Sequence, residues 1–212
     1  MESPGRTMEE VSRDDQELLR RMARGDESAF RALYEHHQRP IYRFALHMSG
    51  NAATAEEVTQ EVFMLLISNP RGFEPAKGTL SNYLFGMARN LTRRSVVNNH
   101  LHVALADENG DDDSLLPADD QDLLDELTHE ETLSSLRTAV LTLPERYREV
   151  VVLCDLEEIS HAEAAEALQC SMGTVASRLH RARAMLKIKI AQASQAKAGT
   201  LHEKLSGQKC AK

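Results

Sequence analysis

Tryptophan is absent from the sequence, and the chain contains only five phenylalanines and four tyrosines. Glycine and proline are also scarce, with ten and six residues among 212. The apolar residues recur mostly at the three- and four-residue spacing of a helix. The length suits one large or two small domains. We therefore predict an all-α protein built from two small helical domains.

Long apolar runs are missing as well, and none is long enough to cross a bilayer. Residues 1–15 are polar and lack the apolar core of a signal peptide. The three cysteines, Cys154, Cys170 and Cys210, are an odd number at no metal-like spacing. We expect a cytoplasmic protein that holds no metal and no cofactor.

Lysine and arginine are missing from residues 101–131, where twelve acidic residues occur. The whole chain has a net charge of −8, so removing these twelve negative charges leaves +4 on the remainder. A segment this charged has too little apolar surface to bury a core, which predicts a flexible linker. The predicted parts are, in order, a disordered N-terminus, a helical domain, the linker, a second helical domain and a tail: 1–11, 12–98, 99–131, 132–190 and 191–212.

The stretch 160–189 predicts two helices joined by a tight turn. Ser160 and Glu163 form a capping box that starts the first helix. The second helix has one apolar stripe and many basic residues, and no acidic residue occurs between Ser171 and Lys189. This arrangement is typical of a helix-turn-helix that enters the major groove of DNA. An ordinary helical hairpin with a solvated basic face is the alternative for this stretch taken alone.

A second amphipathic stretch covers residues 54–68 and opens on a Thr54–Glu57 capping pattern. The spacing places Val58, Val62, Leu65 and Leu66 on the core face. Acidic and amide side chains form the opposite face, with three apolar residues beside them: Phe63, Met64 and Ile67. Apolar residues off the core stripe and next to charge favour a partner-binding face over a purely solvated surface.

Residues 69–78 are dense in proline and glycine and predict a loop, after which Thr79 caps another helix. The outer side of that helix carries asparagine and arginine, which suit base edges and phosphates. Tyr83 and Phe85 are available to stack on an unpaired base, or they belong to the core. This loop and helix therefore form a second candidate nucleic-acid site.

Taken together, the two halves resemble an extracytoplasmic-function (group IV) sigma factor of bacterial RNA polymerase, in the sigma-70 family. The likeness covers residues 12–98, similar to sigma region 2, and 132–190, similar to region 4. Three stretches carry it: AEEVTQEVFMLL, FEPAKGTLSNYLFGMARNLTRR and LPERYREVVVLCDLEEISHAEAAEALQCSMGTVASRLHRARAMLK.

The resemblance implies a non-enzymatic specificity subunit. Such a subunit binds core RNA polymerase, recognises the −35 and −10 promoter elements and helps to open the −10 duplex. The implied partners are the clamp helices of the largest polymerase subunit, promoter DNA and an anti-sigma factor, with no lipid or small-molecule substrate. The acidic linker is expected to run through the polymerase near the active site and the RNA exit path.

The family's roles fall on three sets of residues. The core-polymerase set is Glu57, Gln60, Glu61, Phe63 and Met64. The −10 DNA set is Lys77, Ser81, Asn82, Tyr83, Arg89, Asn90, Arg93 and Arg94. The −35 DNA set is Ser171, Thr174, Ser177, Arg178 and Arg181.

Three positions depart from the family pattern. Tyr83 stands where a tryptophan is usual, and Ala176 stands where a basic residue is common. Gln169 stands where the helix-turn-helix turn usually has glycine, and a left-handed glutamine costs roughly 1 kcal/mol. We expect weaker stacking, a lost phosphate contact and an altered turn, respectively.

Two other classes of protein remain open from the sequence. A helix-turn-helix regulator that acts without polymerase explains the C-terminal half but leaves the acidic helix at 54–68 unexplained. A metal- or redox-responsive protein would use His36, His37 and the cysteines. Adjacent residues on a helix point in different directions, so we predict solvated histidines instead.

Overall fold

Helices form every regular element in residues 8–105 and 136–207, the two ranges that this computed structural model describes. The predicted all-α class is therefore confirmed. Most of the predicted linker, residues 106–131, lies outside the described ranges. Within them, no helix is long and apolar enough to cross a membrane.

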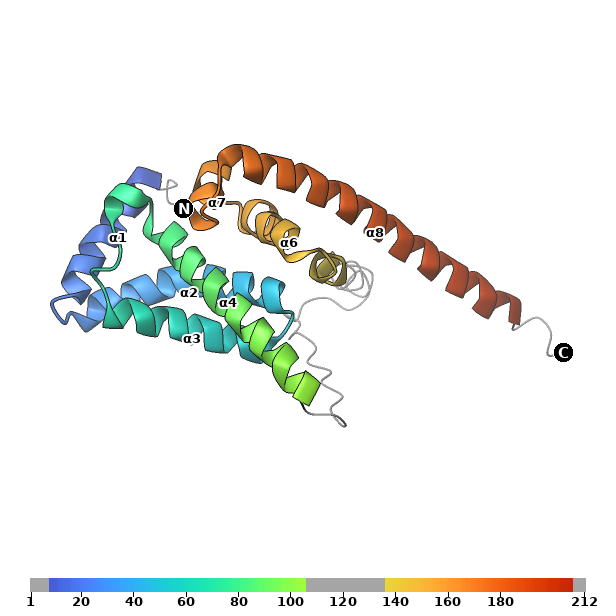
Figure 1. Cartoon of the computed structure of the whole chain (residues 1–212), viewed down its shortest axis with the longest axis horizontal. Helices are drawn as coiled ribbons and strands as arrows, with labels where there is room; N and C mark the ends of the chain where they lie inside the picture. Colours follow the sequence, from blue (N-terminus) through green and yellow to red (C-terminus); the bar gives the residue numbers. More distant parts are fainter. Residues whose placement is uncertain (1–7, 106–135, 208–212) are drawn as a thin grey trace, which may run out of the picture.

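The N-terminal half is a bundle organised around its second helix, which packs against the other three long helices (Figure 1). Its core contains the fully buried side chains of Leu33, Phe44, Leu66 and Leu84. Phe44 also packs edge-on against Phe85, with 5.6 Å between the ring centroids. The elements are α1 (Met8–Met22), α2 (Glu27–Ser49), α3 (Ala52–Ser68), the short 3-10 helix η1 (Pro75–Lys77) and α4 (Leu80–Leu105).

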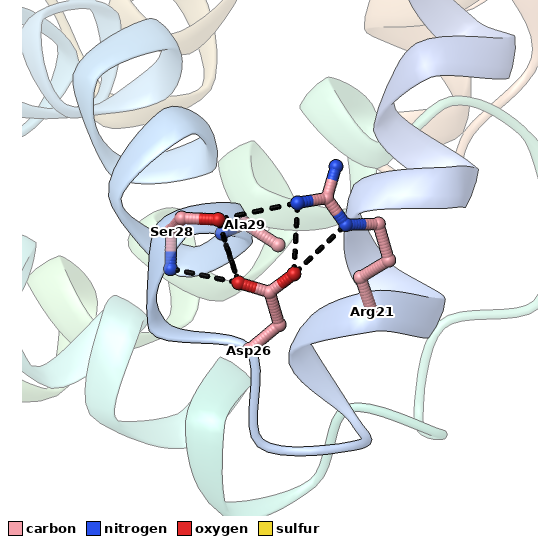
Figure 2. A network of polar contacts seen from close by, with 4 residues as sticks. All are labelled: Arg21, Asp26, Ser28 and Ala29. Atoms are coloured by element: carbon pink, nitrogen blue, oxygen red, sulfur yellow. Dashed lines mark hydrogen bonds and ion pairs between the residues drawn. The ribbon is translucent and has the colours of Figure 1, made fainter.

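Helix α2 begins at a capped N-terminus (Figure 2). The Asp26 carboxylate accepts hydrogen bonds from the backbone N–H of Ser28 at 2.9 Å and of Ala29 at 3.3 Å. Arg21 at the end of α1 donates to the same carboxylate at 2.9 Å. The hydrogen bonds from Ser28, and then those from Arg21, lower the pKa of Asp26 to about 2. The cap therefore joins two helices as well as starting one.

We predict that Asp26→Asn lowers the midpoint of thermal unfolding by about 2 to 4 °C at pH 7. Asparagine keeps the cap and removes the charge. A depressed carboxyl pKa contributes stability above its unfolded value of about 3.9, and that contribution is lost as the pH falls toward 2. Thermal melts of both proteins from pH 2 to pH 7 measure the difference. A difference that stays constant across this range would contradict the role of the charge.

Two predicted boundaries at helix starts are wrong. Residues 8–11, predicted to be disordered, belong to helix α1, which begins at Met8. Helix α3 is capped by Asn51, whose side chain accepts the Thr54 N–H at 2.8 Å, because asparagine three residues earlier offers the better cap. Pro40 does not interrupt α2, since Ile41 and Phe44 beyond it are buried in the core and hold the helix in place.

The regular elements of the C-terminal half are also helical, as the predicted all-α class requires. Residues 136–141 are helical, and three helices and one π-helical turn come after them. The capping box at Ser160 and Glu163 is present, as predicted. Buried residues of all these helices form the core: Val140, Leu143, Val150, Leu153, Ala164, Val175 and Leu179. The elements are α6 (Glu145–Val151), the π-helical η2 (Val152–Leu156), α7 (His161–Ala167) and α8 (Met172–Gly207).

Helices α4 and α8 extend beyond their predicted ends. Helix α4 includes residues 99–105, which were assigned to the linker, and α8 includes residues 191–207 of the predicted tail. Figure 1 shows α8 reaching well past the rest of the molecule. Alanine, lysine and glutamine recur in this tail, and all three have high helix propensity.

Candidate functional site

Helix α3 presents apolar side chains that the bundle leaves uncovered. Met64, Leu65 and Ile67 are 55%, 44% and 46% exposed. Three of the residues predicted to bind polymerase are exposed on the same helix: Glu57, Gln60 and Glu61. An exposed mixture of apolar and acidic groups is typical of a partner-binding face.

The burial of Phe63 and of Leu65 is the reverse of what the sequence predicts. Phe63, predicted to stand off the core stripe, is buried because its ring packs 4.8 Å from that of Tyr34 and 6.4 Å from that of Phe30. Leu65, predicted in the core, is exposed instead. Each residue turns a helix by about 100°, and the aromatic rings of α2 attract Phe63 across the edge of the stripe.

A groove of about 790 Å³ runs between α2 and α3 beside the exposed residues. Phe63, Phe30 and Tyr34 contribute aromatic surface to it, and Met64 and Ile67 lie on its α3 side. Its polar lining comes from Gln38, Arg39, Glu56, Thr59 and Gln60. Leu65 is not among the lining residues. An apolar groove with polar edges can accept the ridge of a partner helix.

A second cavity, of about 440 Å³, lies where the loop before α4 meets α7. Phe73 and Tyr83 line it with their rings 5.8 Å apart. The Asn82 amide nitrogen donates to a Glu166 carboxylate oxygen at 2.6 Å, while its buried carbonyl oxygen has no hydrogen-bond partner. We call this space the loop cavity. Its two aromatic rings and its amide suit a planar base with polar edges.

Five of the predicted −10 residues line this cavity, and the other three, Ser81, Arg93 and Arg94, do not. Asn82 is buried, and Ser81, Tyr83 and Arg89 are half-buried. The remaining four are exposed: Lys77, Asn90, Arg93 and Arg94. The fold therefore brings a buried amide, an aromatic ring and the cations Lys77 and Arg89 together at the cavity. Helical periodicity did not indicate that Asn82 would be enclosed.

His37 is buried rather than solvated, so the prediction for it is wrong, while His36 is exposed as expected. The Nε2 of His37 lies 3.1 Å from an Asp15 carboxylate oxygen, and its Nδ1 lies 3.5 Å from the Ser81 hydroxyl. The three side chains come from α1, α2 and α4. These contacts connect α4 to α1 and α2 of the bundle.

The residues predicted to bind −35 DNA lie at the start of α8. The Ser171 hydroxyl caps this helix by accepting the Thr174 N–H at 3.1 Å. Ser177 and Arg181 are exposed and Arg178 is half-buried. A hydrogen bond from Arg181 lowers the pKa of the Tyr147 phenol, which places that guanidinium beside α6. The helix therefore presents hydroxyl and cationic groups together, as a reading helix requires.

The turn between α7 and α8 keeps its geometry without glycine. Gln169 has a φ of 53°, the left-handed conformation that glycine adopts freely. The Cys170 N–H closes the turn by donating to the Ala165 carbonyl at 3.0 Å. Gln169 therefore adopts the left-handed conformation here, at a strain cost of roughly 1 kcal/mol.

We predict that Gln169→Gly raises the free energy of unfolding by about 0.5 to 1 kcal/mol. The substitution relieves the left-handed strain, and this gain exceeds the added entropy of a glycine in the unfolded chain. Denaturant melts of both proteins measure the change. Gln169→Ala keeps the strain and serves as the control, so equal stabilisation by alanine would contradict the explanation.

Contacts between the two halves were not predicted. Arg43 of α2 makes two hydrogen bonds with Glu157, at 2.6 and 3.1 Å. Burial raises the pKa of Glu157, an effect that its hydrogen bond with Arg43 opposes, and Glu157 in turn raises the pKa of Arg43. Arg89 of α4 pairs with Glu149 at 2.5 Å. Single-sequence patterns carry no signal for pairs this distant along the chain.

Comparison with known proteins identifies both halves. Residues 33–100 match the family model "Sigma-70 region 2" and residues 133–186 match "Sigma-70, region 4". The chain is 30% identical over 179 residues to the ECF RNA polymerase sigma factor SigW of Bacillus subtilis, covering 80% of this chain and 92% of SigW. This chain belongs to the ECF sigma factors of the sigma-70 family. It therefore acts in promoter-directed initiation of transcription by RNA polymerase.

Other relatives agree with this family. The ECF sigma factor SigE of Mycolicibacterium smegmatis is 32% identical over 177 residues, 81% of this chain and 66% of that protein. Two solved structures share the fold. CnrH, in complex with the cytosolic domain of CnrY, has a TM-score of 0.64 at 21% identity, covering 84% of this chain and 98% of that chain. RpoE of Bartonella quintana, in complex with the anti-sigma factor NepR, has a TM-score of 0.62 at 23% identity, covering 76% and 96%.

Family membership bears on one of the alternatives that the sequence left open. A regulator that acts without polymerase is not favoured, since region 2 accompanies region 4 in this sigma factor. The acidic helix that such a regulator leaves unexplained is α3, within the matched region 2.

Proposed function

We propose that this sigma factor docks on core polymerase through the groove between α2 and α3. The observation that carries the proposal is the exposure of Met64 and Ile67 beside an aromatic groove, with Glu61 exposed on the same helix. Apolar side chains would fill the groove while basic residues of the polymerase clamp helices pair with the acids. Phe63 contributes as the buried wall of the groove rather than as an exposed contact.

The loop cavity is proposed as the site for an unpaired base of the −10 non-template strand. Flipping a base costs a few kcal/mol, and stacking near Tyr83 with hydrogen bonds from Asn82 would offset part of this. The cations of α4, with Lys77 of η1, would hold the adjacent phosphates. The two DNA-binding domains are proposed to span residues 12–98 and 132–190.

Region 4 is proposed to read the −35 element through the N-terminal turns of α8. Arg178 and Arg181 are its principal cations there, and Ala176 contributes no charge. Each DNA-binding domain alone would bind the promoter weakly. Because one chain joins the two domains, binding of the first raises the effective concentration of the second at its element, which makes promoter binding cooperative.

The protein is proposed to be a non-catalytic subunit that works in the cytoplasm and is held inactive by an anti-sigma factor. The two similar folds support this partner, because RpoE was solved with the anti-sigma factor NepR and CnrH with the cytosolic domain of CnrY. The acidic segment at 101–131 would pass near the polymerase active site, where its charge resembles that of nucleic acid.

Gel filtration of the purified protein with core RNA polymerase tests the docking proposal. We expect a one-to-one complex that survives dilution to submicromolar concentration. Separate elution of folded protein and core polymerase would overturn the proposal and favour a regulator that binds DNA alone.

A further inference from the structure

Two arginines from different helices of region 4 lie against a single tyrosine. The guanidinium of Arg146, on α6, lies over the ring of Tyr147, with its central carbon 4.8 Å from the ring centroid. Arg181 reaches the same side chain from α8, and its hydrogen bond lowers the pKa of the Tyr147 phenol, an effect to which the charge of Arg146 adds. Tyr147 is only 9% exposed and belongs to the hydrophobic core. We call Arg146, Tyr147 and Arg181 the two-arginine site.

No acidic side chain in the described part of the chain pairs with either arginine of this site. Both arginines are exposed to solvent. The two acids nearest to Arg146 in the sequence pair with α4 instead, Glu145 with Arg93 and Glu149 with Arg89. Two cations held close together without a carboxylate between them create a positive potential that attracts anions.

The place of this site beside the proposed reading helix indicates which anion it meets. Arg181 belongs to the −35 set, and the other cation of that set, Arg178, lies on the same helix. A guanidinium binds phosphate through paired N–H donors, and phosphate contacts around a reading helix fix its register on the duplex. Ala176 of α8 offers no such contact, although a basic residue is common at its position. A cation from a neighbouring helix can supply it.

We propose that Arg146 binds a DNA backbone phosphate beside the −35 element, next to the contact made by Arg181, and that Tyr147 is the positioning residue for both guanidiniums. The inference rests on the proposed −35 role of α8. The contact comes from α6, outside the helix-turn-helix, and compensates for the one missing at Ala176. Because a phosphate carries no sequence information, it adds affinity without adding preference for one sequence.

Arg146→Ala tests this contact through the salt dependence of DNA binding. The probes are a fluorescein-labelled −35 duplex from a promoter transcribed with this protein and a scrambled duplex of equal length. Fluorescence anisotropy of the full-length protein measures both, from about 50 to 200 mM salt. We expect about five- to tenfold weaker binding to both duplexes, and a slope of log affinity against log salt that is smaller by about 1.

Arg183→Ala is the matched control for the loss of charge. It removes one arginine from α8 on the side of η2, where Arg183 pairs with Asp155. We expect less than a twofold change in affinity and an unchanged salt slope, because this residue is not placed at a phosphate.

Tyr147→Phe tests the positioning role separately. The variant keeps the buried ring and removes the hydroxyl to which Arg181 donates. Binding to the −35 duplex should weaken by about threefold while the salt slope stays that of wild type, since no charge is lost. Affinity equal to that of wild type would refute the role of Tyr147.

The remaining outcomes separate this inference from the proposed function. Circular dichroism checks that each variant is folded, and Arg146→Gln replaces an alanine variant that is not. A loss for Arg146→Ala with no change in salt slope, or a loss confined to the −35 duplex, would overturn the phosphate contact. If wild type binds both duplexes equally, the proposed −35 role of α8 is wrong. If wild type prefers the −35 duplex and Arg146→Ala matches it at every salt concentration, only the phosphate contact is wrong.

Discussion

Met64→Asp reduces affinity for core polymerase by roughly 30-fold or more, the loss of about 2 kcal/mol or greater expected at a hot spot. Met64 is 55% exposed and lines the α3 side of the groove. A carboxylate there must be desolvated against apolar surface when the partner helix enters. The folded protein keeps its stability, because the residue is on the surface.

Leu65→Asp is the matched control for this prediction. Leu65 is the next residue of the same helix, is 44% exposed and receives the same change of charge, yet it does not line the groove. Polymerase affinity should stay within about threefold of wild type. Binding of fluorescently labelled protein to core polymerase measures both variants. Equal losses would show that the helix surface in general, rather than the groove, contacts polymerase.

The second large effect concerns region 4. Removing both proposed −35 cations in Arg178→Ala/Arg181→Ala weakens binding to a −35 duplex by about 100-fold, at about 1 to 3 kcal/mol for each residue. Both residues stand within the first three turns of α8, where the helix start is fixed by the Ser171 cap. Anisotropy of full-length protein with a labelled duplex measures the loss.

Arg183→Ala/Lys187→Ala removes the same charge from the same helix and is the control. Arg183 is turned toward η2, where it pairs with Asp155 at 2.5 Å. Only long-range electrostatics should suffer, so we expect a loss of a few-fold that vanishes at higher salt. Equal losses for the two double variants at every salt concentration would mean that the assigned residues do not read the −35 element.

Local patterns in the sequence predicted the helix-turn-helix well. The Ser160–Glu163 capping box is present, and the predicted apolar stripe of the second helix contains the buried residues Val175 and Leu179. These features depend on neighbours within one or two turns, so the sequence contains them directly. Gln169 shows the limit of this approach, because tertiary packing holds it in a conformation that its own preference opposes.

Features that depend on distant residues were predicted poorly. Phe63 is buried because of rings on α2, and His37 is buried because Asp15 is available on α1. The Arg43–Glu157 pair joins residues 114 positions apart. Helical periodicity fixes which residues share a face, but the choice of what covers that face is made by the packing of other helices.

Transcription in vitro with core RNA polymerase on a library of promoter fragments tests the central claim most directly. The protein should direct initiation at a subset of fragments that share one −35 and one −10 element at constant spacing, and core polymerase alone should not. The Met64→Asp and Arg178→Ala/Arg181→Ala variants should lose this selection, while their matched controls keep it. Folded protein that supports no promoter-selective initiation, with core polymerase shown to be active with another sigma factor, would contradict the account.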